Sequence, residues 1–169
     1  MLTKEKERPE DWEKMRYIAQ LLLLTHIYVY TYSPRNDQEA YQYCCTHKNS
    51  FIAIVWPIAQ GHDHAIKKIL NTYGTIKYQK KVLLNYDQAY HLLHTAHPHI
   101  RNIAEHVNWY FPAGTFEKPA RIFIVICPST EQIIACKHAI RKLFSLQYRS
   151  IHVNDTHLET ISLAKFFFT

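Results

Sequence analysis

The sequence predicts an α/β domain in which a four-stranded, mainly parallel sheet is flanked by helices and preceded by a helical amino-terminal arm. The continuous apolar run 51–56 and the segment 121–127, which is apolar after Arg121, have the composition of strands buried on both faces, which is typical of parallel sheets. From residue 51 onward, strand and helix patterns alternate four times, which favours parallel strands joined by helices. A ferredoxin-like α+β arrangement with a split βαβ unit is the alternative, because only four strands are evident.

Length and composition predict one core. A chain of 169 residues with 47% apolar residues suits a single domain, assigned to residues 49–169, with residues 1–48 as an arm packed on it. The formal charge of +6 predicts a mildly basic body that attracts anions. Four cysteines without C-x-x-C spacing, and no secretory signal, indicate reduced thiols in a cytoplasmic protein. The apolar run 17–32 is too short and too interrupted for a membrane span of about 20 residues, so no membrane partner is expected.

The arm begins with a helical pattern. Pro9 suits the first turn of a helix, and apolar residues then recur at helical spacing, so a helix is predicted over about residues 10–24. Residues 25–32 are rich in β-branched and aromatic side chains and fit either a strand or a continued helix. Asn36 or Asp37 can cap a further short helix.

The first half of the body follows the apolar run 51–56. A polar turn then leads into a helical stripe that ends at Gly74, and residues 75–84 form a second strand whose lysines suit a sheet edge. Asp87 opens a predicted helix to about residue 95. Residues 99–120 show weak periodicity and are interpreted as a long loop or lid.

The second half of the body repeats the pattern. The strand 121–127 is followed by a capping box from Ser129 to Gln132, which predicts the start of a helix. Residues 151–153 form the last strand. A second capping box, from Thr156 to Glu159, opens the final helix.

A parallel sheet would bring three polar turns to one crevice. They are residues 60–64, 127–130 and 154–157, each at the carboxyl end of a predicted strand and each opening a helix whose free N–H groups favour an anion. We therefore expect a phosphate-bearing small ligand at this crevice. Helix capping alone, at roughly 0.5 to 2 kcal/mol per cap, is the alternative explanation of the polar residues.

Histidines beside a carboxylate suggest proton transfer. The candidate catalytic residues are His152, Asp155 and His157, because an imidazole–carboxylate pair can act as an acid or a base. The candidate ligand-binding residues lie in the same three turns: Asn154, Thr156, Gly61, His62, His64, Ser129 and Thr130. Histidines that only make surface or structural hydrogen bonds are the alternative. The His-x-His spacing at 62 and 64 is too weak a signal to predict a metal site, and the sequence identifies no cofactor.

Several standard motifs are absent. With three glycines, the chain has neither a Gly-x-Gly-x-x-Gly fingerprint nor a Walker A loop. Cys127 ends a strand before a capped helix, as some nucleophilic cysteines do, but Ile133 stands where a phosphatase loop would need arginine. A buried, small apolar role is the alternative for Cys127.

A non-enzymatic binding module is the alternative function. In one version the arm mediates association between copies of the chain. In the other, basic residues form a face for nucleic acid. The residues of this expected basic face are Lys67, Lys68, Lys77, Lys80, Lys81, Lys137, Arg141, Lys142 and Arg149.

The segment 150–160, the Ile-Val-Trp-Pro strand end at 54–57 and the Tyr73-Gly74 helix end carry a resemblance. Together they resemble the amino-terminal region of uncharacterised bacterial proteins associated with nucleotidyltransferase-like domains. The transferase part of such proteins carries a Gly-Ser pair, which this sequence lacks, so no transferase residue is carried over. The resemblance implies an accessory domain that handles a nucleotide, a nucleotide-sugar or another phosphorylated ligand, accessory to nucleotidyl or sugar-phosphate transfer.

Overall fold

The structure, a computed structural model, describes residues 9–169, except for the side chains of residues 9–12, 25–31 and 147. The chain divides after Ser33 into two units. The first contains helix α1 (Pro9–Thr31), so the helix continues through the stretch that could have been a strand. Within the described residues, no helix combines the length and the apolar character needed to cross a membrane.

The second unit, Pro34–Thr169, contains one antiparallel sheet. Its strands are β1 (Ser50–Val55), β2 (Thr75–Val82), β3 (Ala120–Ile126) and β4 (Ile151–Val153), in the order β2-β3-β1-β4. Every pair of neighbouring strands is antiparallel, so the predicted mainly parallel sheet was wrong. β3 lies between β1 and β2, and β1 lies between β3 and β4. This is the split βαβ connectivity that the sequence left as the alternative.

The error has a physical cause. Every residue of β1 and β3 is buried, because these two strands are central and helices cover both faces of the sheet. Successive side chains point to opposite faces. Phe51, Ala53 and Val55 pack under one helical layer, while Ile52 and Ile54 are buried on the other face. A continuous apolar run therefore shows that both faces are covered, but it does not show which way the neighbouring strands run.

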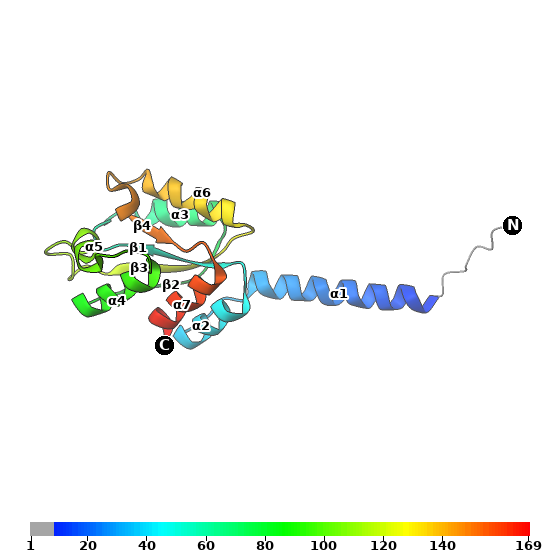
Figure 1. Cartoon of the computed structure of the whole chain (residues 1–169). Coiled ribbons are helices and arrows are strands. Elements are labelled where there is room, and N and C mark those ends of the chain that lie inside the picture. Colours follow the sequence, from blue (N-terminus) through cyan, green and yellow to red (C-terminus); the bar gives the residue numbers. More distant parts are fainter. Residues whose placement is uncertain (1–8) are drawn as a thin grey trace. The chain divides into compact units, whose positions relative to one another are not determined.

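Helices form a layer on each side of the sheet (Figure 1). On one face lie α3 (Asp63–Tyr73) and α6 (Thr130–Arg141), and on the other lie α2 (Asp37–Thr46), α4 (Tyr86–Ala96) and α7 (His157–Phe168). The predicted caps at Asn36, Ser129 and Thr156 are confirmed, since each side chain accepts a hydrogen bond from the backbone N–H three residues later.

Two further features concern the connections. α5 (Ile103–Tyr110) packs beside α4, so the interpretation of residues 99–120 as a long loop was wrong for this part. The short 3-10 helix Gln147–Arg149 leads into β4. At the end of α3 the chain passes so close to β3 that a side chain at Gly74 would collide with the carbonyl of Ile126.

Candidate functional site

Asn154 forms a buried hydrogen-bond cluster at the end of β4. Its side-chain oxygen accepts from the backbone N–H of Ile52 at 2.6 Å, and its amide nitrogen donates to the carbonyl of Thr156 at 2.8 Å and to the hydroxyl of Thr160 at 2.6 Å. The Thr160 hydroxyl donates in turn to the carbonyl of Ser50 at 2.9 Å. These bonds tie β4 and α7 to β1. Asn154, a candidate ligand-binding residue, therefore has a structural role in this geometry.

His152 is paired with Glu159. The Nε2 atom of His152 lies 2.8 Å from a carboxylate oxygen of Glu159, whose other oxygen accepts from the backbone N–H of Asp155 at 3.3 Å. Thr156 caps α7 by accepting from the backbone N–H of Glu159. The carboxylate beside His152 is thus Glu159 and not Asp155.

The other two candidate catalytic residues have separate partners. Asp155 pairs with Lys137, whose Nζ lies 3.1 Å from its carboxylate and also donates to the carbonyl of Val153. His157 lies 2.8 Å from the carbonyl of Cys44, which connects α7 to α2. The structure therefore keeps His152 and Asp155 around one cavity and turns His157 toward α2.

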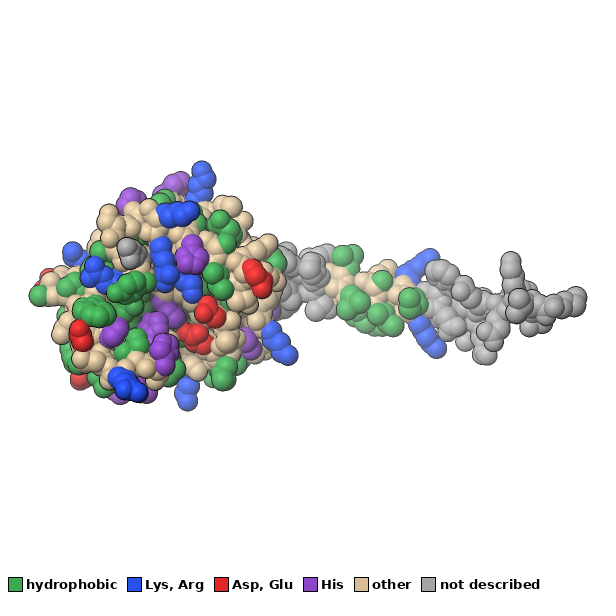
Figure 2. Space-filling model, turned by 45° about the horizontal axis from the view of Figure 1, so that its top comes forward, with side chains coloured by type: hydrophobic (Ala, Val, Ile, Leu, Met, Phe, Trp, Pro, Cys, Tyr) green, Lys and Arg blue, Asp and Glu red, His purple; other side chains and the backbone are tan. Residues whose placement is uncertain are grey.

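A cavity of about 460 Å³ opens beside His152. Its walls come from the end of α4 and the residues after it, from α6, and from the segment joining β4 to α7. We call it the His97–Arg141 cavity, and its polar lining consists of Thr95, His97, His99, Lys137, Arg141, His152, Asp155, Thr156, Glu159 and Ser162. Figure 2 shows histidine, basic and acidic side chains gathered side by side on one face of this unit.

His97 lies in a cluster of rings. Its imidazole meets the ring of His152 edge-on at a centroid distance of 4.8 Å and stacks on Tyr110 at 6.3 Å. Burial, with a contribution from the charge of His152, lowers the pKa of His97 to about 4. His97 is therefore neutral at neutral pH. Its Nε2 atom is buried and has no hydrogen-bond partner in the described part of the chain.

Arg141 is the second cation of this cavity, beside Lys137. It lies one turn after Lys137 on α6, and its buried Nε atom also has no hydrogen-bond partner among the described residues. Asp155 pairs with Lys137 and Glu159 pairs with His152, so both carboxylates of the cavity are already engaged. Buried polar atoms without partners are rare in folded proteins. The cavity therefore presents a guanidinium and an imidazole that an anionic ligand could satisfy.

The predicted convergence of three turns was wrong. In the antiparallel sheet, the carboxyl ends of β1 and β2 lie at one end of the strands, whereas the carboxyl ends of β3 and β4 lie at the opposite end. The turn with Gly61, His62 and His64 therefore lies at the other end of the sheet from residues 154–157. Ser129 and Thr130 do lie at the same end of the sheet as residues 154–157. However, they begin α6 and do not line the His97–Arg141 cavity.

The turn before α3 is held by a buried arginine. Arg121, at the start of β3, donates to the carbonyl of Gly61 at 2.9 Å, to the carbonyl of Ala59 and to the carboxylate of Asp63. Gly61 and His62 adopt positive φ angles of 78° and 58°. The His62 ring packs edge-on against Phe144 at 5.1 Å. These contacts account for Gly61 and His62 without a ligand.

Metal and thiol chemistry find no support in the described residues. No cluster of three or more His, Cys, Asp or Glu side chains among them is arranged to hold a metal ion. The Cys127 thiol donates to the carbonyl of Tyr73 at 3.1 Å, and burial raises its pKa. Cys127 is therefore a buried structural thiol in this geometry.

The expected basic face is smaller than the sequence indicates. Lys77 is buried, and Lys80 binds Asp37 at 2.6 Å and the carbonyl of Phe167 at 2.8 Å. Lys137 is engaged by Asp155. These three lysines contribute to the fold as well as to the charge.

Sequence reasoning missed His97 and Glu159 as site residues and counted Arg141 only toward the basic face. The available signals were the spacing of four between Lys137 and Arg141, which places both on one side of α6, and the position of His97 just after a helix. Neither signal shows that the end of α4 reaches α6. That contact depends on the tertiary fold.

The fold and the cavity define an antiparallel α/β domain with a polar cavity lined by histidines. The sequence matches no protein-family model and no curated protein. The geometry of the cavity is therefore the basis for a functional proposal.

Proposed function

We propose that the unit Pro34–Thr169 binds a phosphate-bearing small ligand, of the nucleotide or nucleotide-sugar type, in the His97–Arg141 cavity. The observation that supports this most directly is the pair of buried nitrogens, on Arg141 and His97, that lack hydrogen-bond partners among the described residues. Phosphate oxygens accept strong, often bidentate hydrogen bonds from a guanidinium. A volume of about 460 Å³ is within the usual range for small-ligand sites.

The proposed roles follow from the contacts. Arg141 and Lys137 hold the phosphate, and Asp155 keeps Lys137 in position through its ion pair. His152, oriented by Glu159, donates a hydrogen bond or a proton to the ligand. By the resemblance of segment 150–160, this binding is accessory to nucleotidyl or sugar-phosphate transfer in the cytoplasm, where the four free thiols would stay reduced.

A neighbouring cavity favours a nucleotide over free phosphate. It has a volume of about 310 Å³ and is lined by Trp109, Tyr148 and Arg149, with both aromatic rings partly exposed. Tyr110 stacks on His97, and its pKa is raised by burial and by Tyr148 and is lowered by the charges of Arg141 and Arg149, so residues of both cavities act on it. Aromatic faces accept a nucleobase by stacking, at about 1 to 3 kcal/mol per base.

Calorimetric titration tests the proposal with nucleoside phosphates, a nucleotide-sugar and inorganic phosphate. We expect Arg141→Gln to weaken binding by about 10- to 100-fold, because a hydrogen bond to a charged group contributes roughly 1.5 to 3 kcal/mol. Lys142→Gln is the matched control. It removes the same charge from the next residue, which is exposed and does not line the cavity.

Two results would contradict this proposal. One is that the wild type binds none of these ligands. The other is that Arg141→Gln and Lys142→Gln lower the affinity equally, which would indicate a general charge effect and no site at the cavity.

Association through α1 is a second candidate function, and the exposed apolar side chains of that helix favour it. Leu22, Leu23 and Leu24 are 66%, 60% and 63% exposed. Such a run of apolar surface is typical of an interaction site. The expected partner is a second copy of the chain. Sedimentation of the full chain should then show a dimer or a larger species. The double substitution Leu22→Glu with Leu24→Glu should convert this species to a monomer. A wild-type chain that sediments as a monomer would exclude self-association through α1.

A further inference from the structure

Two cavities meet in the groove between α3 and the edge strand β2. One has a volume of about 240 Å³ and the other of about 450 Å³, and Lys67 and Gln79 line both of them. They are therefore continuous, and we call them together the α3–β2 groove. None of its lining residues belongs to the His97–Arg141 cavity.

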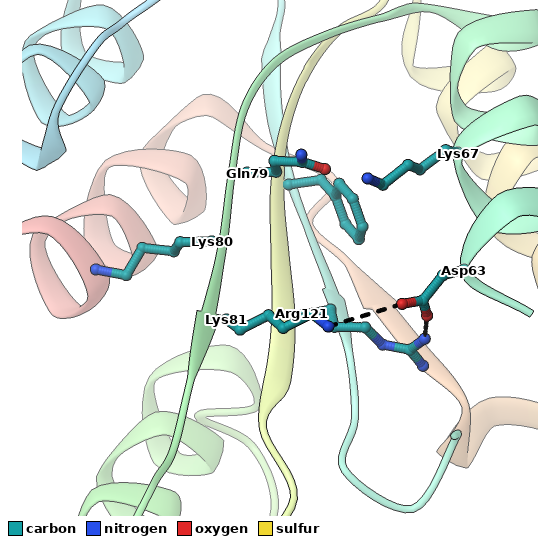
Figure 3. Close-up of a pocket in the computed structure, with 7 residues that line it drawn as sticks. Asp63, Lys67, Gln79, Lys80, Lys81 and Arg121 are labelled. Atoms are coloured by element: carbon teal, nitrogen blue, oxygen red, sulfur yellow. Dashed lines mark hydrogen bonds and ion pairs between the residues drawn. The ribbon is translucent and has the colours of Figure 1, made fainter. Parts of the chain in front are cut away.

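The groove carries an excess of positive charge. Lys67, Lys77, Lys81 and Arg121 line it, while Asp63 is the one carboxylate among the described lining residues. The Asp63 carboxylate pairs with Arg121 and lies 3.9 Å from the Nζ of Lys81. Figure 3 shows Lys67 and Gln79 directed into the cavity, whereas Lys80 points away toward the opposite helical layer. The described residues supply no ion pair for Lys67, so an anion in the groove would meet uncompensated charge.

The groove is partly built from desolvated groups. The Arg121 residue is 5% exposed and is fixed by its bonds to the turn before α3, and Lys77 is also 5% exposed. Burial lowers the pKa of Lys77, which shows that its ammonium is poorly solvated. This separates the groove from an ordinary patch of solvated lysines.

We propose that the α3–β2 groove binds the phosphate backbone of single-stranded nucleic acid, lying along β2. The lining from Ile76 to Lys81 covers about 16 Å of strand, at roughly 3.3 Å per residue. The lining side chains come mainly from one strand and one helix, so their charges can follow a single extended backbone. A peptide strand added to β2 is disfavoured, because edge lysines and the irregular register between Ile76 and Tyr78 hinder pairing.

Fluorescence anisotropy of a labelled oligothymidylate with the full chain, over a series of salt concentrations, tests this inference. We expect Lys67→Gln with Lys81→Gln to weaken binding by about tenfold or more at low salt. The slope of log affinity against log salt should fall by about 1.4, at about 0.7 for each lost phosphate contact with a single strand. The matched control is Lys68→Gln with Lys142→Gln, which removes two exposed charges outside the groove. Both pairs change exposed side chains, so the fold is retained.

Three results would overturn the inference: no binding by the wild type at low salt, equal weakening by the two pairs of substitutions, or a duplex that binds as tightly as the single strand. Arg141→Gln is expected to leave oligothymidylate binding unchanged. The groove and the His97–Arg141 cavity are thereby tested independently.

Discussion

Two polar clusters share the segment 150–160 but differ in how their hydrogen bonds are satisfied. Around Asn154, the side-chain amide and the Thr160 hydroxyl meet partners on β1, on α7 and on Thr156, which caps α7. In the His97–Arg141 cavity, two buried nitrogens, His97 Nε2 and Arg141 Nε, have no partner among the described residues. Polar residues of similar kind thus satisfy one another in one place and leave two buried nitrogens without described partners in the other.

The strongest test of this comparison removes the satisfied cluster. Asn154→Ala deletes three hydrogen bonds, two of them fully buried and each contributing about 1 kcal/mol, and leaves the backbone N–H of Ile52 without its acceptor. We expect the free energy of unfolding, measured by urea denaturation, to fall by about 3 kcal/mol. Thr72→Ala, on the exposed side of α3, should change it by no more than about 0.5 kcal/mol. If Asn154→Ala lowered the free energy of unfolding as little as Thr72→Ala does, Asn154 would have no structural role.

A smaller effect, confined to acidic pH, is expected at His97. Its pKa of about 4 in the folded chain lies below the value of about 6.5 for an exposed histidine. Folding therefore favours the neutral imidazole, so this contribution to stability is complete above about pH 6.5 and is lost as the pH falls through 4. The free energy of unfolding of the wild type should decline over that window more steeply than that of His97→Phe. Parallel declines would show that His97 does not titrate in this way.

The smallest effect on stability is expected at Arg141. Arg141→Met keeps an unbranched apolar stem and removes a buried nitrogen that has no described partner. The free energy of unfolding should stay within about 0.5 kcal/mol of the wild type. A loss similar to that of Asn154→Ala would mean that Arg141 holds the fold, and the contrast between the two clusters would fail.

The elements of the fold were largely predictable, because their signals are local. The central strands β1 and β3 are predominantly apolar, with Ser50 and Arg121 the exceptions, since both faces are buried. α6 and α7 begin at the predicted caps, Ser129 and Thr156. Strand direction has no such local signal. Strand direction depends on the position at which each connecting helix leads the chain back into the sheet. That position is decided by packing across the whole sheet.

The candidate site was predictable only in part for the same reason. His152, Asp155 and Thr156 do line one cavity, because they are close in sequence. Pairing of His152 with Glu159 required the turn of α7 to bring the carboxylate back over β4. His97 enters from a segment more than fifty residues earlier in the chain. No spacing rule connects residues so far apart.

The segment from β2 to β3 leaves the sheet and returns to it at one point, since Val82 pairs directly with Ala120. Everything between them, α4 and α5 included, is an insertion whose two ends already lie side by side. Evolution could therefore exchange this insertion without altering the order of the strands. His97 and Trp109 both lie within it, so ligand preference in this architecture could diversify through a replaceable module while Arg141 and His152 stay with the framework of the sheet.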